Sequence, residues 1–157
     1  MANTYTQIYI HIVFAVQGRH SLIPSQHRET LHKYIAGIVR NRGQKILAVN
    51  VPGDHAHLFI GMTPTICLSD FVRDVKAGSS GFINENRWVR GHFNWQEGFG
   101  AFSHSRSEMD RVIRYIQNQD EHHRRKKFHE EYLEMLKEFG VDFDDRYIFL
   151  PIADQPE

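Results

Sequence analysis

Residues 55–62, with the sequence HAHLFIGM, constrain the fold more than any other stretch of this chain. Side chains in a β-strand point alternately to the two faces of a sheet, so His55 and His57 share one face. The opposite face carries only apolar side chains, those of Ala56, Leu58, Ile60 and Met62. The segment therefore predicts a strand that buries one face in a hydrophobic core and holds a histidine pair on the other.

Four segments have a strand-like pattern, and four have apolar residues at helical spacing. The predicted strands are residues 6–16, 45–51, 55–62 and 93–105. The predicted helices are residues 24–42, 68–83, 107–120 and 122–139, the last of which either continues the third helix or starts a new one. A Pro-Gly-Asp turn at 52–54 joins two of the strands in a hairpin. Within the second helix the sequence AGSSG predicts a kink or a break, because Gly is a poor helix former.

This order of elements, β-α-β-β-α-β-α-α, is typical of the α+β class. It matches a ferredoxin-like (split β-α-β) antiparallel sheet with helices packed on one face and a C-terminal helix that carries Tyr115. The other face of the sheet is then free for function. At 157 residues the chain is long enough for one compact domain, which we assign to residues 1–140, with an acidic and then apolar tail at 141–157.

Composition narrows the possible partners. The formal net charge is zero, so a nucleic-acid binder would have to concentrate its basic residues in a local patch. Cys67 is the only cysteine, which excludes an intrachain disulfide and suits a reducing cytosol. No apolar run is long enough to span a bilayer, and the N-terminus lacks the pattern of a secretory signal, so we expect no membrane partner.

The histidine pair and the third predicted helix together point to a metal site. Two imidazoles at positions i and i+2 of a strand can converge on one divalent ion, but two ligands leave that ion under-coordinated. Tyr115 and Gln119 are four residues apart at the border of the helix's apolar stripe, from which Gln119 could supply a third ligand. The alternative is purely structural: a satisfied histidine pair in a sheet, a partly buried tyrosine and a surface glutamine.

These residues resemble the single-tyrosine HUH transposases, small enzymes that move insertion sequences as single-stranded DNA, and their relatives associated with repetitive extragenic palindromes. His55-Ala56-His57 matches the His-hydrophobic-His motif. YIQNQDEHH at 115–123 matches the C-terminal signature, a tyrosine with Asn-Gln three and four residues on and a histidine pair soon after. The resemblance spans about residues 5–135. Ala56 is smaller than the usual middle residue of the motif, and the acidic tail is not part of it.

The resemblance implies that His55, His57 and Gln119 ligate Mg²⁺ or Mn²⁺ and that Tyr115 is the nucleophile. Its attack on single-stranded DNA at a hairpin-bearing element end would give a 5′-phosphotyrosine and free a 3′-hydroxyl. A metal suits this chemistry because it offsets the negative charge of the phosphate oxygens. The chain has no phosphate-cradling GxxxxGK[ST] loop, so we expect no nucleotide cofactor.

The same resemblance implies an assembly and a location. In this family the tyrosine helix of one chain usually lies over the histidine pair of its dimer partner, so we expect a homodimer with composite active sites. We also expect a cytoplasmic prokaryotic protein that associates with the nucleoid when it is bound to DNA.

Candidate DNA contacts are basic residues near aromatic residues, which could bind phosphates and stack on unpaired bases. They are Arg19, Arg73, Lys76, Arg87 and Arg90, together with His20 and the RRKK run at 124–127. For each of them the alternative is a solvated charge. His11 lies on the histidine face of the first strand, where it could contact DNA or the site or be an ordinary sheet-face histidine.

Three rival functions compete with transposition. The first is a non-catalytic or domesticated relative that binds hairpin DNA, which the retention of Tyr115, Gln119 and both histidines argues against. The second is a replication initiator or relaxase of the same superfamily, which is usually larger than this chain. The third is a metal-dependent hydrolase, but the pattern His-x-His-x-Asp-His is absent because Phe59 stands in place of the aspartate.

Overall fold

The computed structural model describes residues 3–18, 21–123 and 125–150. Its strands are β1 (Tyr9–Ala15), β2 (Lys45–Asn50), β3 (His55–Gly61) and β4 (Gly100–His104). Its α-helices are α1 (Arg28–Asn41), α2 (Leu68–Asn86), α3 (Met109–Gln117), α4 (Gln119–His123) and α5 (Phe128–Glu138). The 3-10 turns are η2 (Ser25–His27), η3 (Arg106–Glu108) and η4 (Asp145–Tyr147).

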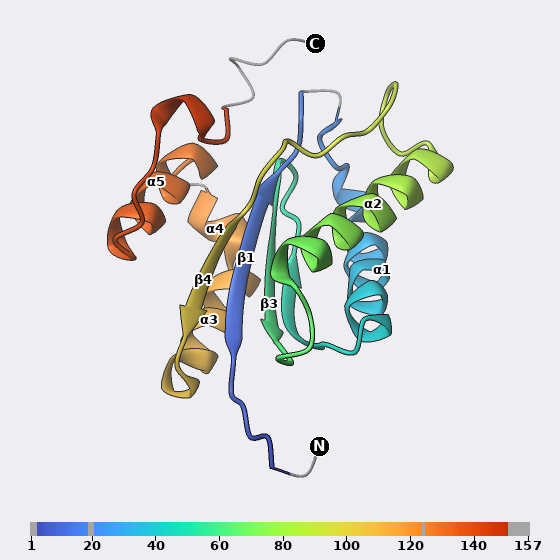
Figure 1. Cartoon of the computed structure of the whole chain (residues 1–157). Helices are drawn as coiled ribbons and strands as arrows, with labels where there is room; N and C mark the ends of the chain where they lie inside the picture. Colours follow the sequence, from blue (N-terminus) through green and yellow to red (C-terminus); the bar gives the residue numbers. More distant parts are fainter. Residues whose placement is uncertain (1–2, 19–20, 124, 151–157) are drawn as a thin grey trace.

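The four strands form one antiparallel sheet in the order β2-β3-β1-β4. Helices α1 and α2 lie on one side of the sheet, and α3, α4 and α5 lie on the other (Figure 1). This architecture confirms the predicted α+β class with a ferredoxin-like antiparallel sheet. The two central strands carry the histidines, and their register sets Val13 opposite His57 and His11 opposite Phe59.

The core beneath α1 and α2 follows the predicted alternation of β3. Ala56, Leu58 and Ile60 are fully buried on this face. They belong to a cluster with apolar residues of β1, α1 and α2, among them Ile12, Phe14, Leu31, Ile35, Val39, Phe71, Val72, Val75 and Ile83. The apolar half of the strand pattern therefore forms the main core.

The opposite face of the sheet is covered by helices, which corrects the expectation that it stands free. Val112 and Ile116 of α3 are buried against Ala48 of β2 and Phe59 of β3. The reason lies in the strand itself, because Phe59 shares the histidine face and burying its ring stabilises the fold by about 1.5–3 kcal/mol. The same cover removes the histidine pair from solvent.

The helix that was expected to carry both Tyr115 and Gln119 is interrupted. Asn118 leaves helical geometry, with φ −96° and ψ 26°, and α4 begins at the next residue. The break removes the helical partners of the Tyr115 and Ile116 carbonyls, and side chains replace them. Asn50 Nδ2 donates to the Ile116 carbonyl at 2.8 Å, and Gln119 Nε2 donates to the Tyr115 carbonyl at 3.1 Å.

The break predicted at AGSSG (77–81) is wrong, because α2 continues through this sequence. Gly78 lies against α1, where a Cβ atom would come within 2.8 Å of Ile38 Cδ1. Ser79 Oγ donates to the Val75 carbonyl at 2.7 Å and accepts from Trp95 Nε1 at 3.0 Å. The small residues let α2 approach its neighbours closely, so tertiary packing overrides their low helix propensity.

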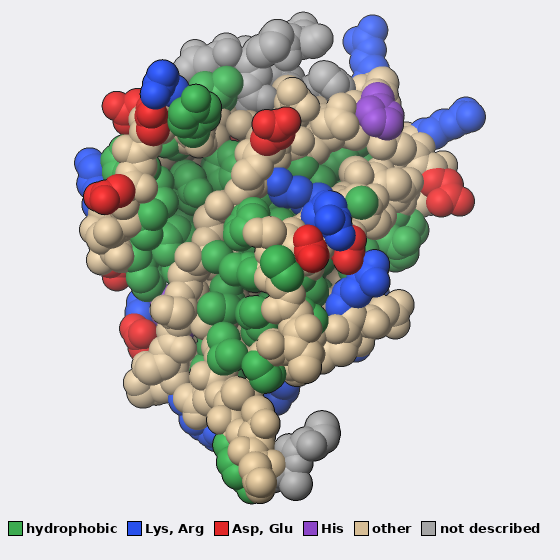
Figure 2. Space-filling view, in the orientation of Figure 1, with side chains coloured by type: hydrophobic (Ala, Val, Ile, Leu, Met, Phe, Trp, Pro, Cys, Tyr) green, Lys and Arg blue, Asp and Glu red, His purple; other side chains and the backbone are tan. Residues whose placement is uncertain are grey.

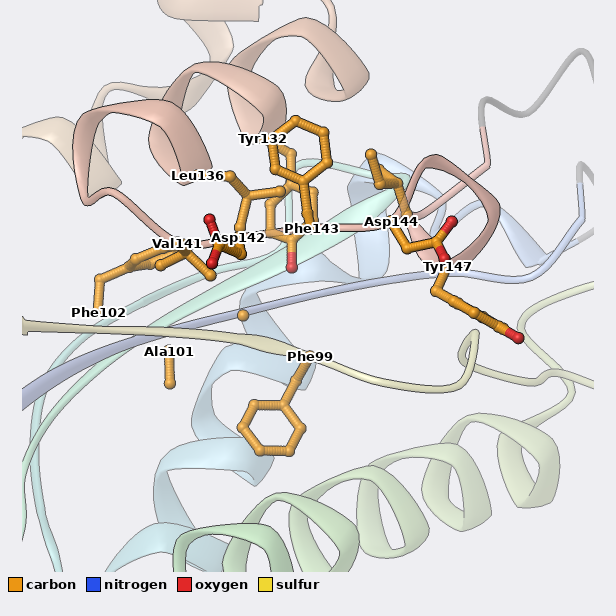
Figure 3. A pocket seen from close by; sticks show the side chains of 12 residues that line it. Phe99, Ala101, Phe102, Tyr132, Leu136, Val141, Asp142, Phe143, Asp144 and Tyr147 are labelled. Atoms are coloured by element: carbon orange, nitrogen blue, oxygen red, sulfur yellow. The ribbon is translucent and has the colours of Figure 1, made fainter.

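The strand predicted over 93–105 is confined to β4, and Trp95 pairs with Val16 only in an isolated bridge. Beyond β4 lie α5 and the C-terminal segment, with Tyr132 packed so closely on Gly100 that a Cβ there would meet its ring at 2.8 Å. A groove of about 350 Å³ separates β4 from this segment (Figure 3). Its lining is mostly aromatic and aliphatic and includes Phe99, Phe102, Tyr132, Leu136, Val141 and Phe143.

The distribution of charged side chains on the surface agrees with the formal net charge of zero. On the face seen in Figure 2, Lys and Arg side chains are interspersed with Asp and Glu, and no large area has a single sign. Within the described ranges, no helix has both the length and the apolar content needed to cross a membrane.

Candidate metal and tyrosine site

The histidine pair lies at the centre of the covered face. His55 and His57 have no solvent-exposed surface, and their ring centroids are 4.8 Å apart with the planes nearly perpendicular, at 79°. Strand alternation places both rings on one side of β3, where Tyr115 of α3, Gln119 of α4 and Glu131 of α5 contact them. Buried imidazoles require partners for both ring nitrogens, so their neighbours define the chemistry of the site.

His55 faces oxygen acceptors on both sides. Its Nδ1 lies 2.5 Å from Asp54 Oδ1, and its Nε2 lies 3.3 Å from Gln119 Oε1. The amide nitrogen of Gln119 is committed to the Tyr115 carbonyl, which fixes the amide oxygen toward His55. A neutral imidazole has one proton, so it cannot donate to both acceptors. A cation between His55 Nε2 and Gln119 Oε1 would satisfy both atoms.

Glu131 of α5 completes the group, and sequence analysis missed it. Its side chain is 3% exposed, and Oε1 lies 3.2 Å from His57 Nε2 and 3.9 Å from His55 Nε2. Oε2 lies 2.7 Å from His122 Nε2. Burial raises the pKa of Glu131, but the neighbouring His57, Tyr115 and His55 side chains outweigh burial and lower the pKa to about 2.

The ligand atoms of His55, His57 and Glu131 all lie within 4.8 Å of one another and form a group that could hold a metal ion. Together with the Gln119 oxygen, the donor set is two imidazole nitrogens and two oxygens. Such a mixed set with hard oxygen ligands fits Mn²⁺ or Mg²⁺. The residues present therefore fit a divalent cation.

The sequence did contain a signal for Glu131. It occupies an interior position of the apolar stripe of α5, whose other buried members are Phe128, Tyr132, Met135 and Leu136. A carboxylate in such a stripe is rarely buried without a partner. An acidic residue at a core position of an amphipathic helix is thus a pointer to a site.

Tyr115 lies beside this group within the same chain. Its ring meets the His57 ring edge-on, with centroids 5.8 Å apart, and the His122 ring at 5.3 Å. Burial raises the pKa of Tyr115 above its usual value, and the charge of Glu131 raises it further. The hydroxyl is therefore un-ionised at neutral pH, and a reaction through its oxygen needs help to remove the proton.

Two hollows open next to Tyr115. One, of about 290 Å³, is lined by Tyr115, Asn118, Glu121, His122 and Arg125. The other, of about 150 Å³, includes His11, His104, Arg111, Tyr115, His122 and Glu131 in its lining. The tyrosine is thus reachable from outside while the histidine pair behind it is not.

Residues 4–119 match the sequence model of the Y1 transposase family, whose members are described as IS200-like transposases. The chain belongs to this family. The finding confirms the resemblance drawn from the histidine motif and the tyrosine signature. The match ends before α5, so Glu131 lies outside the part of this IS200-like transposase that the family model covers.

One curated relative is similar in sequence, and two solved structures are similar in fold. The chain is 23% identical over 120 residues to the ISDra2 transposase TnpA of Deinococcus radiodurans, covering 72% of this chain and 84% of that protein. A putative transposase of the same organism gives a TM-score of 0.56 at 22% identity, covering 74% of this chain and 94% of that one. The structure of a REP-associated tyrosine transposase bound to a REP hairpin gives a TM-score of 0.59 at 16% identity. The match covers 99% of this chain and 96% of that one.

Of the residues predicted to bind DNA in this IS200-like transposase, Lys76 has a structural role in the fold. Its Nζ donates to the Gln96 carbonyl at 2.9 Å and to the Gly98 carbonyl at 2.5 Å, and it lies 5.4 Å from the centre of the Phe14 ring. Burial lowers the pKa of Lys76 to about 8, a shift that the charge of Glu97 partly offsets. Its assignment to DNA stays a prediction.

Of the other predicted DNA contacts, Arg125 of the RRKK run lines the hollow beside Tyr115, whereas those on and after α2 are not brought together with it. Arg73 is on α2, on the far side of the sheet, and its guanidinium lies 3.3 Å from Asp70. Arg87, with a left-handed φ of 54°, caps the end of α2, and Arg90 lies just beyond it. Arg19, His20 and Arg124 lie outside the described residues. The predicted site residues that the fold does bring together are Tyr115, Gln119, His55 and His57.

Proposed function

We propose that this IS200-like transposase cleaves and rejoins single-stranded DNA through a 5′-phosphotyrosine on Tyr115. One observation carries the proposal: a partly exposed tyrosine lies in ring contact with a buried group of two histidines and a glutamate. The family supplies the reaction class, and this juxtaposition supplies a nucleophile next to groups that fit a divalent cation.

His55, His57, Gln119 and Glu131 would hold Mg²⁺ or Mn²⁺. The bound ion would offset the charge on the non-bridging phosphate oxygens. Tyr115 Oη loses its proton and forms the bond to phosphorus, the P–O3′ bond breaks, and the departing 3′-oxygen takes up a proton. Rejoining reverses these steps, because the phosphotyrosine retains the energy of the broken bond, so no nucleotide cofactor is consumed.

The expected substrate is single-stranded DNA with a hairpin at the end of a mobile element. A REP-associated relative with the same fold is bound to a REP hairpin, which supports a hairpin partner here. Two open hollows beside Tyr115 give a strand access to it, and Arg125 in one and Arg111 in the other are the basic side chains there that could bind its phosphates.

A homodimer with composite active sites stays a prediction. The contacts within one chain favour the alternative, since the Tyr115 ring lies 5.8 Å from the His57 ring of the same chain and shares a hollow with Glu131. Mixing Tyr115→Phe with His57→Ala chains, under conditions where chains exchange, separates the two arrangements. Restored cleavage in the mixture indicates a tyrosine acting on the partner's metal site, and no gain over either parent indicates action within one chain.

The reaction is tested by incubating the protein with Mn²⁺ and single-stranded hairpin DNA and searching for a denaturation-resistant protein–DNA adduct. We expect an adduct that Tyr115→Phe and a metal chelator both abolish. Tyr34→Phe is the matched control, because it removes the same hydroxyl from a surface tyrosine of α1 that is 39% exposed. Tight binding of varied hairpins without any adduct would identify a non-catalytic, domesticated relative instead.

A further inference from the structure

The two histidines of the proposed metal site have different partners at their rear nitrogens. His55 has a carboxylate, with Nδ1 2.5 Å from Asp54 Oδ1. An ionised carboxylate only accepts, so a neutral His55 that donates to Asp54 has its ring proton on Nδ1 and a lone pair on Nε2. His57 has a third imidazole in the corresponding position: its Nδ1 lies 2.8 Å from His11 Nε2.

The single ring proton of a neutral His57 therefore has two competing acceptors. Glu131 Oε1 lies 3.2 Å from Nε2, and His11 Nε2 lies 2.8 Å from Nδ1. With the proton on Nε2, His57 donates to Glu131 and has no lone pair for a cation. With the proton on Nδ1, His57 donates to His11, and its Nε2 can act as a ligand.

We infer that His11 is a positioning residue that accepts the Nδ1 proton of His57 and thereby presents Nε2 of His57 as a metal ligand. The inference rests on the proposed function, because it presupposes the divalent-cation site. Second partners of this kind orient metal-bound histidines in many proteins, and their loss lowers metal affinity by about 10- to 100-fold. The ring planes of His11 and His57 are 17° from parallel, and β1–β3 pairing holds them in this arrangement.

The surroundings of His11 keep it able to accept a proton. It is 3% exposed on the central strand β1, with the rings of Phe102, His104 and Tyr115 each 6.2 Å away. A neutral imidazole has one unprotonated nitrogen, so His11 Nε2 can accept the Nδ1 proton of His57 across the 2.8 Å that separate the two atoms.

Calorimetric titration of the full-length protein with Mn²⁺ alone tests this role without DNA. His11→Phe keeps an aromatic ring but removes the acceptor, so we expect Kd for Mn²⁺ to rise about 10- to 100-fold. His11→Gln restores an acceptor at the end of the side chain and should recover most of the affinity. His104→Phe makes the same exchange of imidazole for phenyl on the neighbouring strand β4 and should bind Mn²⁺ like the wild type.

A second readout follows the proton itself. Nitrogen-15 shifts of His57 in the Mg²⁺-loaded wild type should report the proton on Nδ1, and in His11→Phe the distribution should move toward Nε2. A proton on Nε2 in the loaded wild type overturns the inference, as does a folded His11→Phe with unchanged Mn²⁺ affinity. If His11→Phe does not fold, the wild-type spectrum and the affinity of His11→Gln decide the matter.

The failure of the proposed function gives a different result. A wild type that binds Mn²⁺ in a His11-dependent way but forms no DNA adduct leaves the positioning role intact and removes the catalytic one. A wild type that binds no Mn²⁺ removes both. Metal binding and adduct formation are therefore measured on the same preparations.

Discussion

Replacing Asn50 with alanine should weaken the attachment of α3 to the sheet, because it removes a hydrogen bond between β2 and α3. Asn50 ends β2, and its Nδ2 donates to the Ile116 carbonyl at 2.8 Å, where the helix is interrupted at Asn118. A buried carbonyl that loses its only donor costs about 1–3 kcal/mol. Because this bond is only partly buried, we expect a loss of about 1–2 kcal/mol in the free energy of unfolding. For a chain of this size that loss lowers Tm by about 2–8 °C.

Urea unfolding followed by circular dichroism measures this loss as a lower midpoint with an unchanged slope. Asn86→Ala is the matched control, because Asn86 Nδ2 donates to the Phe82 carbonyl at the same 2.8 Å but on the exposed end of α2. That substitution should change the free energy of unfolding by less than about 0.5 kcal/mol. Equal losses in the two variants would refute the argument that the interrupted helix depends on Asn50. Asn50→Ala should also weaken Mn²⁺ binding at 25 °C, since Gln119 follows the break, whereas Asn86→Ala should not.

Three further outcomes follow from the packing and the charges. Gly81→Ala places a methyl group in open space on α2 and should stabilise the fold by about 0.5–1 kcal/mol in thermal unfolding, while Gly78→Ala, which contacts α1, should retain less of that gain. The folded-state pKa of Glu131 is about 2, below the unfolded value of about 4.3, so its contribution to stability is complete above that value and is lost as the pH falls toward 2. Glu131→Gln should therefore weaken the fall in the free energy of unfolding at acid pH. The same substitution at its exposed neighbour, Glu130→Gln, should leave that fall unchanged. An equal pH dependence in the two variants would contradict the role of the Glu131 carboxylate. Mn²⁺ at a hundred times its Kd should raise the free energy of unfolding by about 2.7 kcal/mol, and His55→Ala should abolish this shift.

The fold and the histidine pair could be predicted because their signals are local. Strand alternation in β3 assigns each side chain to a face, and the structure keeps both His55 and His57 on the face opposite Leu58. The tyrosine signature likewise lies in one short segment, and the fold brings Tyr115 to the pair. Periodicity and motif spacing are sufficient when all the relevant residues lie close together in the chain.

The rest depended on contacts between distant segments. The end of α3 depends on Asn50, far away in sequence, and α2 stays continuous because Gly78 and Ser79 meet side chains of other elements. Glu131 joins the site only when α5 folds over the sheet. Propensity rules describe a residue by its neighbours in the chain, so they miss interactions that tertiary packing supplies.

The contribution of α5 has a consequence for how the protein is made. A ribosome releases the sheet and the tyrosine helix before Glu131 emerges, and domains fold progressively as the chain appears. A shortened product that ends before α5 would retain all four strands, both histidines and Tyr115, yet lack the buried carboxylate. Such a nascent or truncated chain would lack one oxygen ligand of the proposed metal site, so the proposed cleavage activity would arise only late in synthesis.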